Sequence, residues 1–151
     1  MECPACGFVA YANPKPTASA LCVDGEGRVL LVRRAIEPFK GDWDIPGGFL
    51  EEGEDPLDGI RRELREETGL QVEPHEFFGA FMDRYGGDST AVSTLNLLWT
   101  AQVVGGEPRP DDDVDELRWF GPNELPPEDE LAFRPNVANV LSAWRAGQKH
   151  A

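Results

Sequence analysis

The sequence predicts a single mixed α/β domain that spans residues 17–148. Three observations support this fold class: two apolar, β-rich runs near the start, one capped helical segment, and a second helical pattern after several long strand-like runs. A chain of 151 residues buries roughly two-thirds of its unfolded surface and can form its own core. Residues 1–16 show no clear periodicity and are expected to form an irregular hook, and residues 149–151 are expected to be a short tail.

The domain begins with the two apolar runs TASALCVD and RVLLVRR. They flank the turn-rich linker DGEG, so we expect them to form a β-hairpin. The next segment, EPFKGDWDIPGG, is dense in glycine and proline and is predicted to be a loop that leads into a short strand.

A helix is predicted from Pro56 to Thr68. Asp55 can cap its first turn, a proline suits the first helical position, and Gly69 follows its last turn. After this helix, the runs EFFGAFMDRY, STLNLLWTAQVV and ELRWF have the composition of strands.

The C-terminal part predicts a second helix. Its apolar residues recur at helical spacing, namely Val137, Val140, Leu141 and Trp144. This segment follows Pro135 and is expected to end before Gly147. The predicted order is therefore hairpin, helix, long strands and terminal helix.

The charge balance limits the partners that this chain can bind. The 14 Lys and Arg against 28 Asp and Glu give a net charge of −14, so neither a nucleic acid nor a membrane is expected as a partner. No apolar run approaches the roughly 18 residues of a membrane span, and the three cysteines do not suggest a disulfide framework, so we expect a cytoplasmic protein. A phosphate-bearing ligand would need a cation.

The predicted central helix separates its charges by sign. Its buried stripe consists of Leu57, Ile60 and Leu64. Acidic side chains fan out on one flank, namely Glu63, Glu66 and Glu67. Glu63 and Glu67 are like charges at i,i+4, a spacing that costs a few tenths of a kcal/mol in a helix. A helix selected for stability alone would alternate the signs.

Converging carboxylates in a protein serve either as a general acid and base with different pKa values or as a site for a hard divalent cation. The spacing favours the cation. Oxygen ligands from one helical turn suit Mg²⁺ or Mn²⁺, whereas Zn²⁺ would require His or Cys, and His75 and His150 lie outside this segment. Such an ion can bridge an acidic site to a polyphosphate and activate a water molecule.

From Gly48 to Leu70 these residues follow a spaced pattern: Gly, five spacers, Glu, seven spacers, Arg-Glu-Leu, one spacer, Glu-Glu, one spacer, Gly-Leu. It resembles the Nudix box at every one of its nine defined positions over 23 residues, which is a specific match. WDIPGG before the box and DDDVDELRWFGPNELP near the end are also similar to the family's layout. The resemblance implies the Nudix fold, a mixed β-sheet sandwiched between α-helices. It also implies hydrolysis of a nucleoside diphosphate linked to another moiety.

The resemblance implies roles for individual residues. The catalytic metal ligands would be Glu63, Glu66 and Glu67, with the carbonyl of Gly47 as a further ligand. Glu54 and Arg62 would brace the loop through a bidentate contact that lysine could not make. The general base stays open between Glu63 and the acidic side chains of the loop PRPDDDVDE, namely Asp112, Asp113, Asp115 and Glu116.

The substrate is less defined by the sequence than the chemistry is. Arg34 stands where related hydrolases often place a phosphate contact, with an exposed strand-end arginine as the equal alternative. Four aromatic residues could stack a base, although packing is the more common role of each in a strand-rich domain, namely Trp43, Phe49, Tyr85 and Trp99. Tyr85 is kept as a candidate substrate contact, because its position points to dinucleoside polyphosphates. ADP-ribose, dinucleoside polyphosphates and nucleoside triphosphates stand nearly level as substrates.

Two other functions are compatible with this fold. One is an isomerase of isoprenoid diphosphates, which would use a cysteine and a glutamate; the complete box and cysteines placed away from it count against this. The other is a non-catalytic, nucleotide-sensing domain, which usually shows an eroded box and a fused DNA-binding segment.

The N-terminal hook carries a CxxC pair, Cys3 and Cys6. CPACG followed by YANPKP resembles the second half of a small zinc ribbon, without its first cysteine pair. Three interpretations stay open: a metal-free remnant, which we favour over a Zn²⁺ site, a zinc ion shared across a homodimer, and a truncated ribbon. Cys22 lies in an apolar run and is expected in the core.

Overall fold

The computed structural model describes residues 1–87 and 89–148, and the predicted tail at 149–151 lies outside the described residues. In these described ranges, seven strands form two sheets. The first sheet has the order β4-β1-β6-β5, with bounds β1 (Lys15–Cys22), β4 (Gly47–Phe49), β5 (Leu70–Tyr85) and β6 (Val92–Gly106). The second has the order β3-β2-β7, with bounds β2 (Val29–Arg34), β3 (Trp43–Asp44) and β7 (Val114–Phe120).

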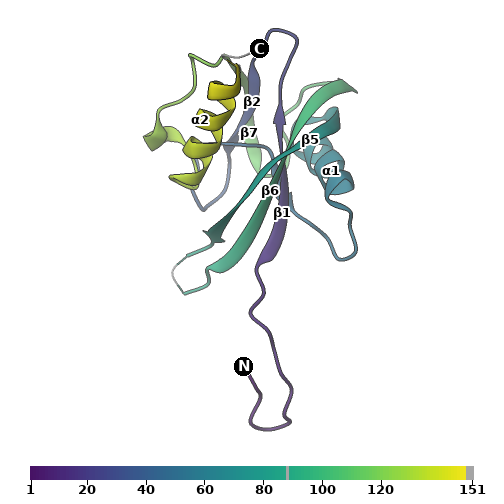
Figure 1. Cartoon of the computed structure of the whole chain (residues 1–151), viewed down its shortest axis with the longest axis vertical. Coiled ribbons are helices and arrows are strands. Elements are labelled where there is room, and N and C mark those ends of the chain that lie inside the picture. The colour runs from purple at the N-terminus through teal and green to yellow at the C-terminus, as the bar shows by residue number, and fades with distance from the viewer. Residues whose placement is uncertain (88, 149–151) are drawn as a thin grey trace.

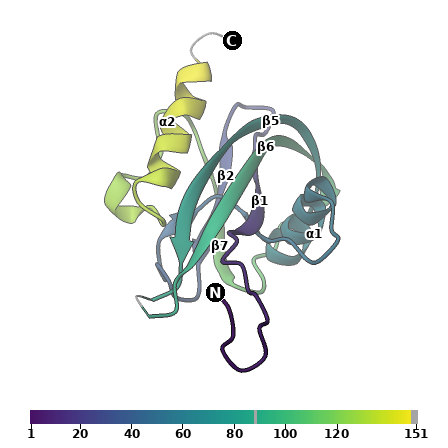
Figure 2. The ribbon, with the colours of Figure 1, turned by 60° about the horizontal axis from the view of Figure 1, so that its bottom comes forward.

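The first sheet is mixed, because β1 pairs in parallel with β6 and antiparallel with β4. Helices α1 (Pro56–Thr68) and α2 (Asn136–Gln148) lie on opposite sides of the strands, and a short 3₁₀ turn (Glu128–Glu130) precedes α2 (Figures 1 and 2). The predicted α/β class, with strands sandwiched between helices, is confirmed. None of the helices in the described part of the chain is long and apolar enough to cross a membrane.

The predicted hairpin of β1 and β2 is wrong. The two strands belong to different sheets, and an isolated bridge joins Val23, just after β1, to Val29 of β2. The turn between them is present, since the Asp24 carboxylate accepts the backbone N–H groups of Glu26 and Arg28, each at 2.9 Å. Both edges of β1 are already occupied by β4 and β6, so β2 pairs with β3 and β7 instead.

Two apolar clusters hold the layers together. One joins β1, β2 and the start of β5 to α1, through residues such as Ala20, Ile60 and Leu64. The other packs α2 on the sheets through three fully or nearly fully buried residues, Val137, Leu141 and Trp144. The terminal helix is therefore confirmed, but it continues through Gly147 to Gln148 rather than ending before the glycine.

The hook extends away from the domain at the N-terminus (Figure 1). It is irregular, as predicted, apart from one bridge between Glu2 and Val9, and β1 begins at Lys15, two residues before the predicted domain boundary.

Candidate active site

The helix that carries the acidic residues has the predicted bounds because both of its ends are capped. Asp55 Oδ1 accepts the N–H of Leu57 at 2.9 Å, and Pro56 occupies the first turn. Gly69 closes the helix at φ 72°, and its N–H donates to the carbonyl of Arg65 at 3.0 Å. A Cβ at Gly69 would lie 2.4 Å from a backbone carbonyl oxygen, so only glycine fits both the conformation and the space.

The buried face of α1 includes a glutamate. Ile60 and Leu64 are fully buried against the first sheet, whereas Leu57, the third member of the predicted stripe, is only partly buried. Glu67 lies about two turns after Ile60 on the same face of the helix and is 8% exposed. The packing of α1 therefore places a carboxylate inside the protein.

Arg62 ties the helix to the loop before it. Its Nε and Nη2 donate to the two carboxylate oxygens of Glu54 at 2.7 and 2.8 Å, and Nη2 also donates to the carbonyl of Phe49 at 3.1 Å. Its Nη1 reaches Glu63 Oε1 at 2.9 Å and Glu66 Oε2 at 3.2 Å. The bidentate contact with Arg62 lowers the pKa of Glu54 to about 2.

Glu63 and Glu67 converge on the glycines of β4. The N–H of Gly47 donates to Glu67 Oε2 at 3.2 Å. A Cβ on Gly48 would lie 2.6 Å from the carboxyl carbon of Glu63, so this carboxylate fills the space that a side chain would take. Burial raises the pKa of both groups, strongly for Glu67, where the neighbouring Glu63 charge raises the pKa further.

Glu66 is linked to Glu63 through Arg62, whose Nη1 contacts both carboxylates. Its side chain is 45% exposed and its carboxylate faces Arg62. Within residues 1–87 and 89–148, no group of three or more His, Cys, Asp or Glu side chains is arranged closely enough to hold an ion. The structure thus places Glu63 and Glu67 against the glycines of β4, whereas Glu66 is more exposed and shares Arg62 with Glu63.

These two carboxylates line a cavity of about 220 Å³ between the sheets, α1 and the start of α2. Its other acidic side chains come from three further segments, namely Asp44, Asp83, Asp112 and Asp113. Among the described residues that line the cavity, Arg34 is the one cation. Asp115 and Glu116 of the predicted acidic loop do not line it, because they bind Arg33 at 2.8 and 2.9 Å.

The side chain of Arg34 lines the cavity and is held by several partners. Its Nε donates to the carbonyl of Pro38 at 2.6 Å, its Nη1 lies 3.2 Å from Asp44 Oδ2, and its Nη2 lies 3.5 Å from the Tyr85 hydroxyl. The guanidinium carbon also lies over the rings of Tyr85 and Phe133, at 5.9 and 5.2 Å from their centroids. Arg34 and Tyr85, which the sequence indicates for different reasons, therefore lie together.

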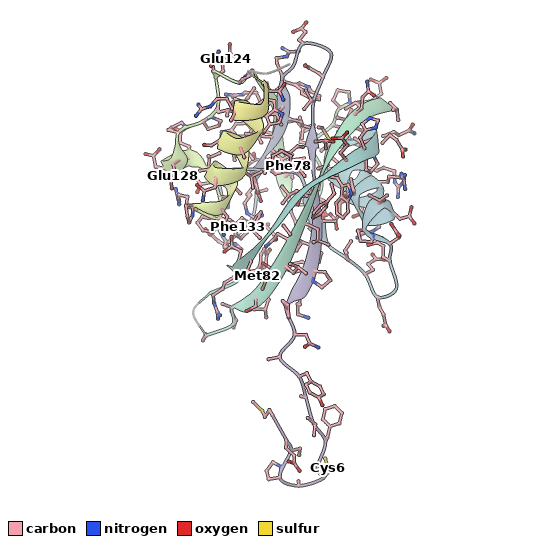
Figure 3. The ribbon with its side chains drawn as sticks, in the orientation of Figure 1. Cys6, Phe78, Met82, Glu124, Glu128 and Phe133 are labelled. Carbon is pink, nitrogen blue, oxygen red and sulfur yellow. The ribbon has the colours of Figure 1, made fainter. Side chains whose placement is uncertain are left out.

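Aromatic rings form the side of the cavity around Tyr85. The ring of Phe49 meets Tyr85 edge-on at 5.1 Å, and Phe133 stacks on Tyr85 at 5.9 Å. Phe133, labelled in Figure 3, comes from the segment before α2 and adopts φ 48°, a conformation that is uncommon for an aromatic residue. Phe49 is predicted to be a packing residue, and the structure places it on the cavity wall as well.

Three of the cavity residues that sequence reasoning did not identify carry a charge or contact Arg34. Asp44 is partly buried, and burial raises its pKa to about 6 although Arg34 opposes the shift. Asp83 accepts a hydrogen bond from Asn136 Nδ2 at 2.9 Å, which joins β5 to the start of α2. Phe133 is the third. A sequence signal existed for Asp44, which lies on β3 shortly before the box pattern. Asp83 and Phe133 line the cavity through long-range packing.

The remaining predictions about single residues concern packing. Trp43 is buried and meets Phe120 edge-on at 5.1 Å, so its expected core position is confirmed. Trp99 is partly buried and packs against Phe77 at 5.1 Å. Cys22 is fully buried, and burial raises the pKa of its thiol to about 12.

The match to known families adds the deciding observation. Residues 13–141 match the family model described as "NUDIX domain". This chain belongs to the NUDIX family. The family match begins after the CxxC pair, so it gives no support to the zinc-ribbon resemblance of the hook. Cys3 and Cys6 lie at the outer end of the hook, and no third candidate ligand joins them in the described residues.

Relatives of this NUDIX chain have different names. The ADP-ribose pyrophosphatase of Methanocaldococcus jannaschii is 35% identical over 133 residues, which are 85% of this chain and 76% of the relative. The NAD-capped RNA hydrolase NudC of Pseudomonas aeruginosa is 30% identical over 97% of this chain, which spans about half, 51%, of that relative. A crystal structure of a NUDIX hydrolase from Nitrosomonas europaea matches with a TM-score of 0.81 and 31% identity, over 99% of this chain and 80% of the other.

Proposed function

We propose that this chain is a divalent-cation-dependent Nudix pyrophosphohydrolase. It would cleave the phosphoanhydride bond of a nucleoside diphosphate linked to another moiety. The observation that carries the proposal is the pair of carboxylates of Glu63, which is partly buried, and Glu67, which is buried, on the wall of a cavity that also holds Arg34 and Tyr85. Such a cavity suits a phosphate ligand, because the carboxylates can hold a metal cation that binds the phosphates and the arginine can bind a phosphate oxygen directly.

The residues present fit a hard divalent cation. Two neighbouring carboxylates that are both shielded from water destabilise each other, and a bound cation removes that penalty. Their oxygen atoms are donors that Mg²⁺ or Mn²⁺ prefers. The carbonyl of Gly47 joins the proposed ligand set through the family resemblance, and the N–H of the same residue donates to Glu67. Glu66 joins the proposed ligand set through the family resemblance, and its carboxylate would have to leave Arg62 to do so.

When bound, such a cation offsets charge on the phosphates and lowers the pKa of an attacking water. The protein groups hold this arrangement in place. Arg62 and Glu54 brace the loop through their bidentate contact, which keeps the β4 glycines against the carboxylates. Arg34 would bind a phosphate oxygen, because its guanidinium is already oriented by Pro38 and Asp44.

The general base can be narrowed to three groups. Asp115 and Glu116 are engaged by Arg33 away from the cavity and are no longer candidates. Glu63, Asp112 and Asp113 line the cavity and stay as candidates. Each could accept a proton from water at a carboxylate oxygen.

ADP-ribose is the substrate to test first, because the relative from Methanocaldococcus jannaschii bears that name at 35% identity. The aromatic wall formed by Phe49, Tyr85 and Phe133 would hold the base or the terminal sugar. We include NAD-capped RNA among the substrates to test, because one relative is named an NAD-capped RNA hydrolase. Cleavage of this substrate would contradict the expectation that the protein binds no nucleic acid.

The test is a substrate panel with Mg²⁺ or Mn²⁺: ADP-ribose, NADH, dinucleoside polyphosphates, nucleoside triphosphates, NAD-capped RNA and isopentenyl diphosphate, with products separated by chromatography. One preferred substrate cleaved at its phosphoanhydride bond, with loss of cleavage in a chelator, is the expected result. Binding without turnover would favour a sensor. Isomerised isopentenyl diphosphate would overturn the proposal, and the position of Cys22 in the core rather than on the cavity wall opposes that outcome.

A further inference from the structure

Two contacts join β5 to the segment 133–136, where α2 begins. Tyr85 of β5 stacks on Phe133, with ring centroids 5.9 Å apart and an angle of 21° between the ring planes. Two residues earlier on β5, Asp83 Oδ2 accepts a hydrogen bond from Asn136 Nδ2 at 2.9 Å. Alternate residues of a strand face the same side, and Asp83 and Tyr85 both line the cavity. An aromatic pair and a carboxylate therefore lie side by side on one wall.

The carboxylate of Asp83 is oriented by neutral donors. The side-chain amide of Asn136 also donates to the carbonyl of Met82 at 3.3 Å, so this amide is held between Met82 and Asp83. Figure 3, which labels Met82 and Phe133, shows β5 next to the segment before α2. Asp83 Oδ1 accepts the backbone N–H of Arg84 at 2.8 Å. The direction of the carboxylate is thus fixed before a ligand arrives.

Asp83 keeps acceptor positions free for a ligand. A carboxylate offers about four lone-pair positions, and the two neutral donors occupy one on each oxygen. None of the ion pairs within residues 1–87 and 89–148 includes Asp83, so no arginine or lysine in these ranges neutralises its charge. A carboxylate in this situation is stabilised by a hydrogen-bond donor of the ligand.

A phosphate cannot be the ligand group that meets Asp83. Arg34, the proposed phosphate contact, pairs with Asp44 at 3.2 Å. Burial raises the pKa of Asp44 to about 6, and the negative charge of Asp83 adds to this rise, so Asp83 lies near that pair. A phosphate that faced Asp83 directly would be repelled. The group at Asp83 must therefore be a neutral donor, and a nucleotide has two kinds: the hydroxyls of its ribose and the amine of its base.

The base is favoured over the ribose, because the aromatic pair beside Asp83 offers a surface on which a planar base can stack. We propose that Asp83 is a specificity-determining residue, which accepts a hydrogen bond from the exocyclic amine of a base stacked at Tyr85 and Phe133. The inference rests on the proposed function, since it assumes a nucleotide whose phosphates lie at the metal and Arg34.

This contact distinguishes adenine from hypoxanthine. Adenine carries an exocyclic amine, which is a donor, whereas hypoxanthine has a carbonyl oxygen at the same position. That oxygen would face the carboxylate of Asp83 with no hydrogen atom between them, and both acceptors would be left unpaired. The cavity should therefore select the adenine nucleotide.

The test compares ADP-ribose with its hypoxanthine counterpart, inosine diphosphate ribose, on the full chain in Mg²⁺. We expect kcat/KM for the adenine substrate to exceed kcat/KM for the hypoxanthine substrate at least about 10-fold. Asp83→Asn should lower this ratio to about one or below, since its amide can also donate to the carbonyl oxygen. The ratio is measured within each variant, so it does not depend on the fraction of protein that is folded.

Asp115→Asn is the matched control and should keep the wild-type ratio, because Asp115 binds Arg33 at 2.8 Å outside the cavity. A wild-type ratio near one would overturn the inference. So would an Asp83→Asn variant that keeps the wild-type ratio, and an equal loss of kcat/KM on both substrates in that variant would place the carboxylate at the ribose hydroxyls instead.

Binding separates this inference from the hydrolase proposal. If neither substrate is cleaved, the hydrolase proposal fails, and calorimetry with AMP and IMP in Mg²⁺ still measures the preference for the base. Tighter binding of AMP that is lost in Asp83→Asn would support the role of Asp83 without hydrolysis, and equal binding of the two would overturn it. Cleavage of both substrates at equal kcat/KM would overturn the inference and leave the hydrolase proposal intact.

Discussion

Arg34 and Asp44 form a largely buried ion pair between β2 and β3, with Nη1 3.2 Å from Oδ2 and side chains that are 14% and 16% exposed. Arg34 is further held by the carbonyl of Pro38 and by two aromatic rings. The guanidinium is therefore oriented before any ligand arrives, and a phosphate would not have to immobilise it.

Arg34→Lys should raise KM about 10-fold or more, because an ammonium group cannot bind Pro38, Asp44 and a phosphate at once. Steady-state kinetics on the preferred substrate of the panel measures this. Arg33→Lys is the matched control: Arg33 adjoins Arg34 on β2 and binds Asp115 and Glu116 outside the cavity. Equal effects of the two substitutions would show that Arg34 has no special contact with substrate.

Glu67→Gln should stabilise the cation-free protein while lowering turnover at least about 100-fold. The pKa of Glu67 is raised in the fold above its usual value of 4.5. The contribution of this carboxyl group to folding stability is therefore fully present below pH 4.5, where the group is protonated, and is lost as the pH rises through the folded pKa. At pH 7.5 in a chelator, Glu67→Gln should melt a few degrees above wild type, and near pH 4.5 the gain should disappear. Glu66→Gln, at an exposed position, is the control and should leave the melting temperature unchanged. If Glu67→Gln melted below wild type at pH 7.5, the charge of Glu67 would not destabilise the cation-free fold.

Arg62→Lys should lower stability by about 1.5–3 kcal/mol, since lysine cannot make the paired contact with Glu54 together with the bond to the carbonyl of Phe49. Urea denaturation gives the free energy of unfolding. Arg61→Lys serves for comparison, because Arg61 binds Asp58 and Glu73 on the helix surface and should lose less than about 1 kcal/mol. Similar losses would mean that Arg62 is an ordinary surface arginine.

Cys22 should make the domain sensitive to alkali. Its thiol ionises near pH 9 in the unfolded chain and only near pH 12 in the fold. The contribution of the buried thiol to folding stability is therefore fully present below pH 9 and is lost as the pH rises from 9 to 12. The loss should be about 1.4 kcal/mol per pH unit above 9. Denaturation of wild type and Cys22→Ala at several pH values measures it: the difference between them should shrink above pH 9. A constant difference would show that Cys22 does not titrate in this range.

The helix α1 could be predicted from the sequence because everything that defines it is local. Asp55, Pro56 and Gly69 lie within or beside the segment itself, and the spacing of its charges places Glu63 and Glu67 on one flank. The hairpin could not be predicted correctly, because the partner of β1 is β6, whose residues follow some 80 positions later. Two neighbouring apolar runs do not reveal that they pair with different partners.

The cavity could be predicted only in part, because its residues come from segments that are distant in the sequence. Arg34 and Tyr85 can be identified as single residues, but nothing local shows that they meet across 51 positions. Asp83 and Phe133 enter the cavity only because the start of α2 packs on β5, where Asn136 binds Asp83. Such contacts depend on the tertiary fold, and residues of this kind carry no periodic or spaced signal.

The parallel pairing of β1 with β6 also determines when the chain can fold during synthesis. Residues 15–22 of β1 pair with residues 94–101 of β6, so β1 lacks this neighbour until about two-thirds of the chain has been made. A nascent chain that already contains the complete helix α1 still exposes an apolar strand with a free edge. Premature termination before β6 is therefore expected to release a fragment with a free apolar edge that is prone to aggregate.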